Sequence, residues 1–564
     1  MSRRGLGERL RRAPSPAHLG LAVVLAGGLA LRLHGIRHGL PYVYHSDEAR
    51  HFTSLAIPMF EDGLNPGYFQ NPSAFTYLVH FTLRLQYGGG WPFGDFHGLV
   101  AQYAADPSEV YETARQLATA LCLLGVAAVF AVGRRLWGAM EGLAAAAVLA
   151  FAFIPVAYSR YALTDVGVLA PVAVAVYATI RAHEDGRARH FVLAGAAAGL
   201  AIGFKYTAGL LLVPLLVAAA MRATRDRAAI RSAAAALVAA AVAFLVTTPY
   251  FLLDFDEAVR QLRSQSYAAD QPRFGQQPAN GYWFYLGSLT WGLGWAAAFA
   301  AAAGALLELR RDRRRMALLA LFPVALFAYL GGAERFFGRW LMPVYPVLAL
   351  LAGVALARFA RALSSRPIVR GGALVALLLA VLAQPIAAGV RTGRVLGRQD
   401  TRTETRQYLL RALPEATRLV VEPAVPRRWY RGLAVGFGPP RVAKGQFPPA
   451  LTAPTRLIME LGPARIDRYR SAGYCLVVTM STVRDRAEIA GQAAAIAYYR
   501  RLERESTVVF RASPYRRGAS PPDFDFDFSI HLYYPREFAR PGPEVIVYRL
   551  DRCQAGRGRT AQGN

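Results

Sequence analysis

The sequence predicts a polytopic α-helical membrane protein with about 11 spans, followed by a small α/β domain. The first observation is composition, because 54% of the 564 residues are hydrophobic and only 18% are charged. The second is that apolar residues recur in blocks of about 20, the length with which a helix crosses a bilayer core. The third is a change near residue 390, after which apolar runs become short and strand-like.

Eleven apolar blocks are interpreted as spans. They cover about 17–36, 114–133, 139–157, 164–182, 190–204, 206–221, 233–249, 282–307, 316–332, 340–357 and 371–389. The first block follows a basic segment and lacks a clear small-residue cleavage site, so we expect an uncleaved span and not a signal peptide. A large outer loop, 37–112, contains a short apolar segment, 74–87, expected to lie in the membrane interface. A polar loop is expected at 250–281.

The net charge of +28 comes from arginines that gather in short connections between the apolar blocks. These connections are 134–138, 181–190, 222–231, 308–315 and 358–370. Alternate threading of 11 spans places all of them on one side, which the positive-inside rule makes the cytoplasmic side. No Walker, zinc-finger or RNA-binding motif occurs, so we expect no nucleic-acid partner. A multi-pass protein of the cell (inner or plasma) membrane is predicted, with membrane lipids as neighbours.

The predicted division is a transmembrane domain over 1–390 and an extracytoplasmic α/β domain over 391–564. Short apolar runs at 419–421, 476–478 and 545–548 predict strands, and 403–413 and 487–502 predict helices. A Pro-, Asp- and Phe-rich segment, 520–528, is expected to be a loop. Cys475 and Cys553 could form a disulfide if this part faces an oxidising compartment, or could remain thiols.

A cluster of ionisable residues follows the first span directly. It contains His45, Asp47 and Glu48, with Ser46 as the predicted N-cap of a helix that runs to about Ile57. Two acids at a helix start either complement the helix dipole or take part in chemistry. The predicted topology places further polar residues on the same outer side, and they are Arg160, Asp165, Lys205, Tyr206, Arg335 and Arg339.

Lys205 stands out because Lys444 is the only other lysine in the chain. A lysine between two apolar spans either contacts an anion such as phosphate or extends its ammonium to the interface. Arg335 and Arg339 could bind the same anion, and an ordinary ion pair with Glu334 is the alternative.

Arg160 and Asp165 lie in the same turn between two spans, and they form either a structural pair at a helix start or a polar contact to substrate. Neither a His-x-x-x-His motif nor a cysteine cluster indicates a zinc site, and no cofactor is certain.

Carboxylates and cations that meet beside a membrane suit transfer of a sugar from a lipid phosphate. A carboxylate would take the proton from an acceptor hydroxyl as this attacks the anomeric carbon. Lys205 and the arginines would stabilise the negative charge on the departing phosphate. A transporter or flippase of lipid-linked sugars is the alternative, although transporters place polar groups near mid-membrane and these lie at span ends.

Several stretches resemble one family in their order and predicted side. They are the Asp47-Glu48 pair after the first span, Ser159-Arg160 with Thr164-Asp165, Gly203-Phe-Lys-Tyr206, Arg339-Trp-Leu-Met-Pro343 with Pro346, and Asp400-Thr-Arg402. This pattern resembles the GT-C superfamily of membrane glycosyltransferases, in the branch of protein O-mannosyltransferases and aminoarabinose lipid A transferases. The resemblance implies a polyprenyl-phosphate-linked sugar donor, inversion at the anomeric carbon, Asp47 as catalytic base and Glu48 as a supporting carboxylate. It leaves a divalent metal possible, and a glycan, a glycolipid or a protein as acceptor.

Overall fold

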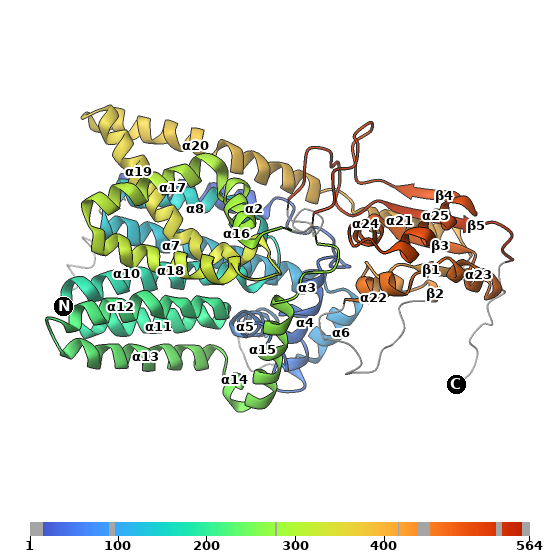
Figure 1. The fold of residues 1–564 in the computed structure, drawn as a ribbon, viewed down its shortest axis with the longest axis horizontal. Coiled ribbons are helices and arrows are strands. Elements are labelled where there is room, and N and C mark those ends of the chain that lie inside the picture. Colours follow the sequence, from blue (N-terminus) through green and yellow to red (C-terminus); the bar gives the residue numbers. More distant parts are fainter. Residues whose placement is uncertain are drawn as a thin grey trace.

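The computed structural model describes residues 15–88, 96–276, 279–414, 417–436, 452–525 and 533–554. Within these ranges a bundle of roughly parallel long helices is followed by a smaller domain built on a sheet (Figure 1). The polytopic helical fold expected from the apolar blocks is therefore confirmed.

Nine helical segments of the described chain are long and apolar enough to cross a membrane. Their main helices are α2 (Pro16–Leu33), α7 (Ser108–Leu136), α10 (Leu169–Asp185), α12 (Leu212–Ala223), α13 (Ala228–Thr247), α16 (Gly281–Leu289) with α17 (Trp295–Arg311), α18 (Arg313–Gly331), α19 (Tyr345–Leu363) and α20 (Pro367–Leu396). Two shorter apolar helices, α8 (Ala139–Phe151) and α11 (Ala188–Phe204), lie where the other two spans are predicted. Short 3₁₀ turns at Thr164–Val168, Tyr206–Leu211 and Gly338–Val344 precede α10, α12 and α19.

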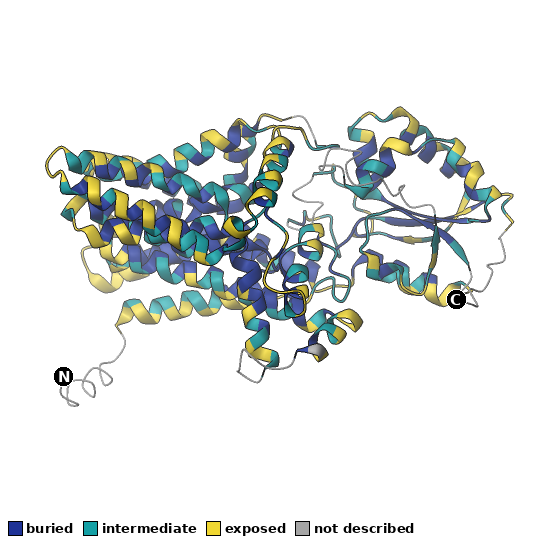
Figure 2. Cartoon of the chain, turned by 90° about the horizontal axis from the view of Figure 1, so that it is seen from below, coloured by how far each residue is buried: buried dark blue, intermediate teal, exposed yellow. Residues whose placement is uncertain are grey.

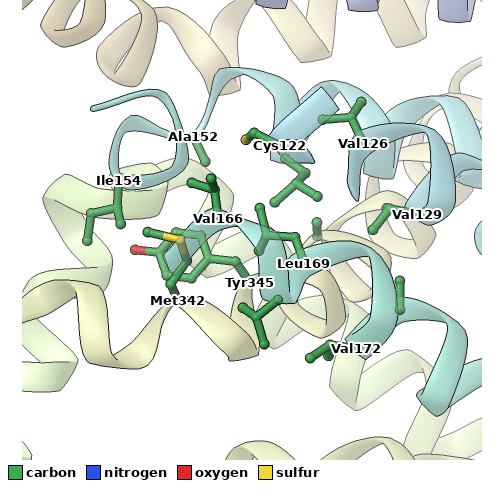
Figure 3. Close-up of a cluster of buried hydrophobic side chains, with 14 of the residues drawn as sticks. Cys122, Val126, Val129, Ala152, Ile154, Val166, Leu169, Val172, Met342 and Tyr345 are labelled. Atoms are coloured by element: carbon green, nitrogen blue, oxygen red, sulfur yellow. The ribbon is translucent and has the colours of Figure 1, made fainter. Parts of the chain in front are cut away.

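The centre of the bundle is an apolar cluster between helices that are far apart in sequence (Figure 3). Its labelled members are Cys122, Val126, Val129, Ala152, Ile154, Val166, Leu169, Val172, Met342 and Tyr345. Small residues let some helices approach more closely still. A Cβ atom added at Gly199 of α11 would lie 2.0 Å from the carbonyl oxygen of Ala240 on α13, so only glycine permits this contact.

The outward faces of the bundle helices are exposed (Figure 2), and many of the exposed residues have large apolar side chains. Val246 is 74% exposed and Ile368 is 89% exposed. Such a surface is unfavourable in water and suits hydrocarbon, which agrees with the spans predicted from length and composition.

Shorter helices gather at the end of the bundle that faces the sheet domain (Figure 1). They are α3 (Ser46–Arg50), α4 (Thr53–Ala56), α5 (Ala74–Tyr87), α6 (His97–Ala105), α14 (Tyr250–Leu253) and α15 (Phe255–Ala269). The prediction of a polar loop at 250–281 was wrong over most of that range, because α14 and α15 occupy it. Its polarity belongs to α15, an exposed helix with only Ala258 and Ala268 buried.

The C-terminal domain contains a mixed five-stranded sheet with strand order β2-β1-β3-β5-β4. The strands are β1 (Arg418–Val421), β2 (Ala434–Gly436), β3 (Leu476–Met480), β4 (Ser506–Ala512) and β5 (Val545–Leu550). β1 pairs in parallel with β2 and β3, whereas β5 runs antiparallel to β3 and β4. The helices are α21 (Thr401–Ala412), α22 (Ala453–Glu460), α23 (Ala464–Ser471), α24 (Ser481–Ile489) and α25 (Ala493–Arg504).

The predicted elements of this domain are present, with one helix divided. The stretch expected to be one helix over 487–502 is split between α24 and α25 at Gly491, whose φ is +61°. Residues 520–525 of the expected loop have no regular structure, and 526–528 lie outside the described residues. Cys475 and Cys553 form a disulfide, so of the two alternatives the structure contains the bridge.

Candidate active site

Helix α3 presents Asp47 and Glu48 and is shorter than expected. Its N-cap is His45 and not Ser46, since the His45 Nδ1 atom accepts a hydrogen bond of 3.4 Å from the Glu48 backbone N–H. The helix ends at Arg50 with His51 as its C-cap, and Phe52, whose φ is +56°, separates it from α4. The Phe52 ring is buried against Phe75, and this packing offsets the cost of the left-handed backbone.

Glu48 is fully buried and bound from several directions. Its carboxylate accepts hydrogen bonds from Arg115 Nε at 2.7 Å, Arg115 Nη2 at 2.8 Å and the Ala162 backbone N–H at 2.8 Å. Arg115 also donates to the carbonyl oxygens of Ile36 and His38. The Glu48–Arg115 pair therefore ties α3 to α7 and fixes the direction in which the neighbouring residue points.

Asp47 points the other way, and its side chain is 34% exposed. Its Oδ2 atom accepts a hydrogen bond of 2.5 Å from Arg339 Nη2. The backbone carbonyl oxygen of the same Arg339 accepts a 3.0 Å hydrogen bond from Lys205 Nζ. Lys205 Nζ also lies 2.6 Å from Asp165 Oδ1. Four predicted residues from four separate segments thus form one continuous chain of contacts.

Two further arginines, Arg273 and Arg335, lie near one another at this end of the bundle, and Arg273 lies close to Asp47 and Arg339. The Arg339 guanidinium lies 5.4 Å from the centre of the Phe337 ring, and the Arg273 guanidinium lies 4.9 Å from the same ring. Burial, together with the neighbouring cations Arg486, Arg335 and Arg339, lowers the pKa of Arg273 to about 9. Arg335 is half-buried and forms no ion pair with any residue that the structure describes.

The carboxyl of Asp47 is kept ionised by these cations. Burial would raise its pKa, but the Arg339 guanidinium outweighs burial and holds the pKa well below the usual range. Burial lowers the pKa of His45, so its ring is neutral at physiological pH. The site therefore combines the ionised Asp47 carboxylate and the Lys205–Asp165 pair with a larger number of positive charges.

Two predicted residues lie apart from these contacts. Arg160 is fully buried, and its Nη2 atom donates to the carbonyl oxygens of Leu31 at 2.7 Å and Gly389 at 2.8 Å. It does not pair with Asp165, because Lys205 does so. The Tyr206 hydroxyl donates to the Phe69 carbonyl oxygen at 3.0 Å. Both residues connect segments of the bundle, and neither makes a direct contact with Asp47 in the structure.

The sheet domain reaches the site through Arg486 of α24. Its Nη2 and Nε atoms donate to the Phe274 carbonyl oxygen at 3.1 Å and 3.3 Å. Gly275, with a φ of +72°, lies so close that an added Cβ would be 2.8 Å from the Arg486 Cβ. The loop that carries Arg273 is therefore held directly against α24.

Comparison with known proteins agrees with this geometry. A family model described as dolichyl-phosphate-mannose-protein mannosyltransferase matches residues 108–252. No curated protein matches the chain by sequence. ArnT from Cupriavidus metallidurans bound to undecaprenyl phosphate superposes with a TM-score of 0.54 at 16% identity, covering 95% of this chain and 98% of ArnT. The apo oligosaccharyltransferase of Archaeoglobus fulgidus gives a TM-score of 0.54 at 12% identity, covering 94% of this chain and 76% of that one. The chain has the GT-C fold.

Two cations in this part of the GT-C fold, Arg273 and Arg115, were not predicted from the sequence. Arg273 falls in the segment interpreted as a polar loop, where nothing distinguishes it from other exposed arginines. Arg115 could have been found, since an arginine at the start of an apolar span needs a buried partner and Glu48 was available.

A metal centre at the GT-C site would need ligands that are not already engaged. Glu48 is bound to Arg115, and Asp165 is bound to Lys205. Among the described residues no group of three or more His, Cys, Asp or Glu side chains is placed to hold a metal ion. This set of donors does not fit a metal ion.

Proposed function

We propose that the protein is a glycosyltransferase that moves a sugar from a polyprenyl-phosphate donor to an acceptor hydroxyl. The observation that carries this proposal is the contact between Asp47 and Arg339, because it joins an ionised carboxylate to a group of cations at the end of a membrane bundle. The bound undecaprenyl phosphate in the ArnT structure supports the same class of donor. Lipid tails would remain beside the bundle while the sugar phosphate reaches the site.

In this reaction Asp47 accepts the proton of the acceptor hydroxyl while its oxygen attacks the anomeric carbon. The bond from that carbon to the phosphate oxygen breaks, and the lipid phosphate leaves. Attack opposite to the leaving group inverts the anomeric configuration. Lys205, Arg273, Arg335 and Arg339 stabilise the charge that grows on the phosphate, which is the main electrostatic requirement of the step.

The Asp47–Arg339 pair explains how a strongly ionised carboxylate can act as a base. Arg339 would exchange its carboxylate partner for the donor phosphate, which takes a guanidinium in the same planar geometry. Loss of the Arg339 contact removes the main cause of the low pKa of Asp47. The base would therefore become more basic only when the donor is bound.

The remaining predicted residues have supporting roles in this proposal. Glu48 and Arg160 position the active-site segments, Tyr206 anchors the loop at Phe69, and His45 caps α3. The site and the sheet domain lie on the extracytoplasmic side of the cell membrane, opposite the arginine-rich connections. The acceptor is a glycan, a glycolipid or a protein at that face.

The test is product analysis with purified full-length protein in nanodiscs, given a panel of polyprenyl-phosphate sugars and extracts of cell-envelope acceptors. Mass spectrometry should detect a new glycosidic product that Asp47→Asn abolishes. Asp256→Asn is the matched control, since Asp256 is exposed on α15 and makes no contact with the site. Movement of the labelled lipid across the bilayer without a new glycosidic bond would instead support a transporter or flippase.

A further inference from the structure

The sheet domain contains a polar cavity that is separate from the site at Asp47. Its volume is about 410 Å³, and it lies between the start of α24 and the ends of β3 and β5. A smaller cavity adjoins it and shares Ser481, Asp485, Tyr515 and Phe524 as lining residues. The larger volume is within the range of cavities that hold small ligands.

Aromatic side chains line this cavity on several sides. Tyr499 comes from α25, Tyr548 from β5, and Tyr515 and Phe524 from the segment after β4. Because these rings come from different elements, the cavity offers flat apolar faces beside polar groups. The C–H face of a sugar ring packs on such surfaces, while the hydroxyls around its edge need hydrogen-bond partners.

Carboxyl groups supply those partners. Asp485 lines both cavities and forms no hydrogen bond or ion pair with any residue in the described ranges. Burial and the nearby Glu488 raise the pKa of Asp485 to about 7. Near neutral pH this carboxyl can therefore accept a hydrogen bond when ionised or donate one when protonated.

The charge of the lining narrows the ligand class. Asp485, Glu488, Asp523 and Glu544 line the larger cavity, against the single cation Arg484. Arg484 is already bound to Glu488 at 2.9 Å. Glu544 also pairs with Arg511, at 3.5 Å. A phosphorylated or uronic-acid glycan would be repelled by this acidic lining, whereas a neutral sugar could bond to the Asp485 carboxyl.

We propose that this cavity binds one or two residues of a neutral glycan. The claim that the cavity holds the acceptor rests on the proposed function, whereas the claim that it binds a glycan does not. The position fits an acceptor, because α24 lines the cavity through Asp485 and contacts the Arg273 loop through the next residue, Arg486. A bound chain would be kept beside the active site while its free end is glycosylated.

The test uses the full-length protein in nanodiscs on an array of neutral oligosaccharides of hexoses, pentoses and N-acetylhexosamines. Calorimetry then measures the affinity of the strongest array ligand. Asp485→Asn should weaken binding about tenfold, as expected for loss of a hydrogen bond to a charged group. Asp551→Asn, an exposed position outside both cavities, should bind like the wild type.

Binding that is equal in Asp485→Asn and wild type would overturn the proposal, as would an array without any ligand. A hexalysine peptide is included as a cationic probe. If it binds and no neutral glycan does, the proposal is overturned and the cavity is a peptide site. Asp47→Asn should bind the glycan normally although it transfers nothing. A wild-type protein that binds glycan but makes no product would refute only the proposed function.

Discussion

Replacing Glu48 by Gln should destabilise the protein, whereas replacing its neighbour Asp47 by Asn should remove activity and leave stability almost unchanged. Glu48 is fully buried and accepts three hydrogen bonds, two of them from Arg115. A glutamine retains one acceptor oxygen and leaves the Arg115 charge buried without a counter-ion. Breaking a buried pair in this way costs about 3–5 kcal/mol.

At about 2 °C per kcal/mol for a large chain, the expected fall in Tm for Glu48→Gln is about 6–10 °C. The Asp47–Arg339 pair is one-third exposed on the carboxylate side, so its loss should cost at most about 1 kcal/mol. The effect of Asp47→Asn on the transfer rate is larger, because removal of a general base typically lowers the rate by about 10²–10⁴-fold.

Both variants are measured together in nanodiscs, by thermal unfolding followed through tryptophan fluorescence and by product formation at saturating donor. The reasoning fails if Glu48→Gln unfolds at the wild-type temperature, or if Asp47→Asn keeps more than a tenth of the wild-type rate. Because the two carboxylates are adjacent in sequence, each variant serves as the control for the other.

Three further predictions concern other parts of the chain. Lys205→Gln should lower kcat at least tenfold, because the charge on the leaving phosphate loses stabilisation. Steady-state kinetics with varied donor concentration measures this kcat. An unchanged kcat would mean that Lys205 only pairs with Asp165. Burial raises the pKa of Glu422 to about 8 from 4.5, so its contribution to stability is full below pH 4.5 and is lost as pH rises towards 8. Glu422→Gln should therefore show a smaller fall in Tm over this pH range than the wild type. An equal change of Tm with pH in both proteins would contradict the prediction. The Cys475–Cys553 bridge spans 78 residues, so its reduction should destabilise the sheet domain by about 4 kcal/mol. The reduced protein should also migrate more slowly on a denaturing gel than the non-reduced protein. Identical mobility of the two samples would argue against the bridge.

The membrane helices were predictable because the bilayer restricts both their length and their composition. The apolar block expected at 282–307 belongs to a helical segment at Gly281–Arg311, and the block at 371–389 lies within α20. The sequence also singles out Lys205 through its rarity in an arginine-rich chain, and its role in binding an anion stays a prediction. These signals are local in sequence and need no knowledge of tertiary contacts.

Features that depend on distant partners were not predictable in the same way. The Glu48–Arg115 pair joins residues 67 positions apart, and the Arg339–Asp47 pair joins residues 292 apart. Phe52 breaks the expected helix only because its ring is buried against Phe75. Strand β4 was missed although it contains the apolar run Val508-Val509-Phe510, because much of the strand is exposed and its pairing with β5 defines it.

The contact between Arg486 and the Phe274 carbonyl has a mechanical consequence. The sheet domain cannot swing away from the bundle about the α20–α21 junction without dragging residues 273–275 or breaking both hydrogen bonds. Close apposition at Gly275 leaves no slack in this link, because even a methyl group would collide there. A tilt of the outer domain at this contact would be transmitted to the segment that carries Arg273, and under the proposed function it would change the position of a cation that stabilises the leaving phosphate.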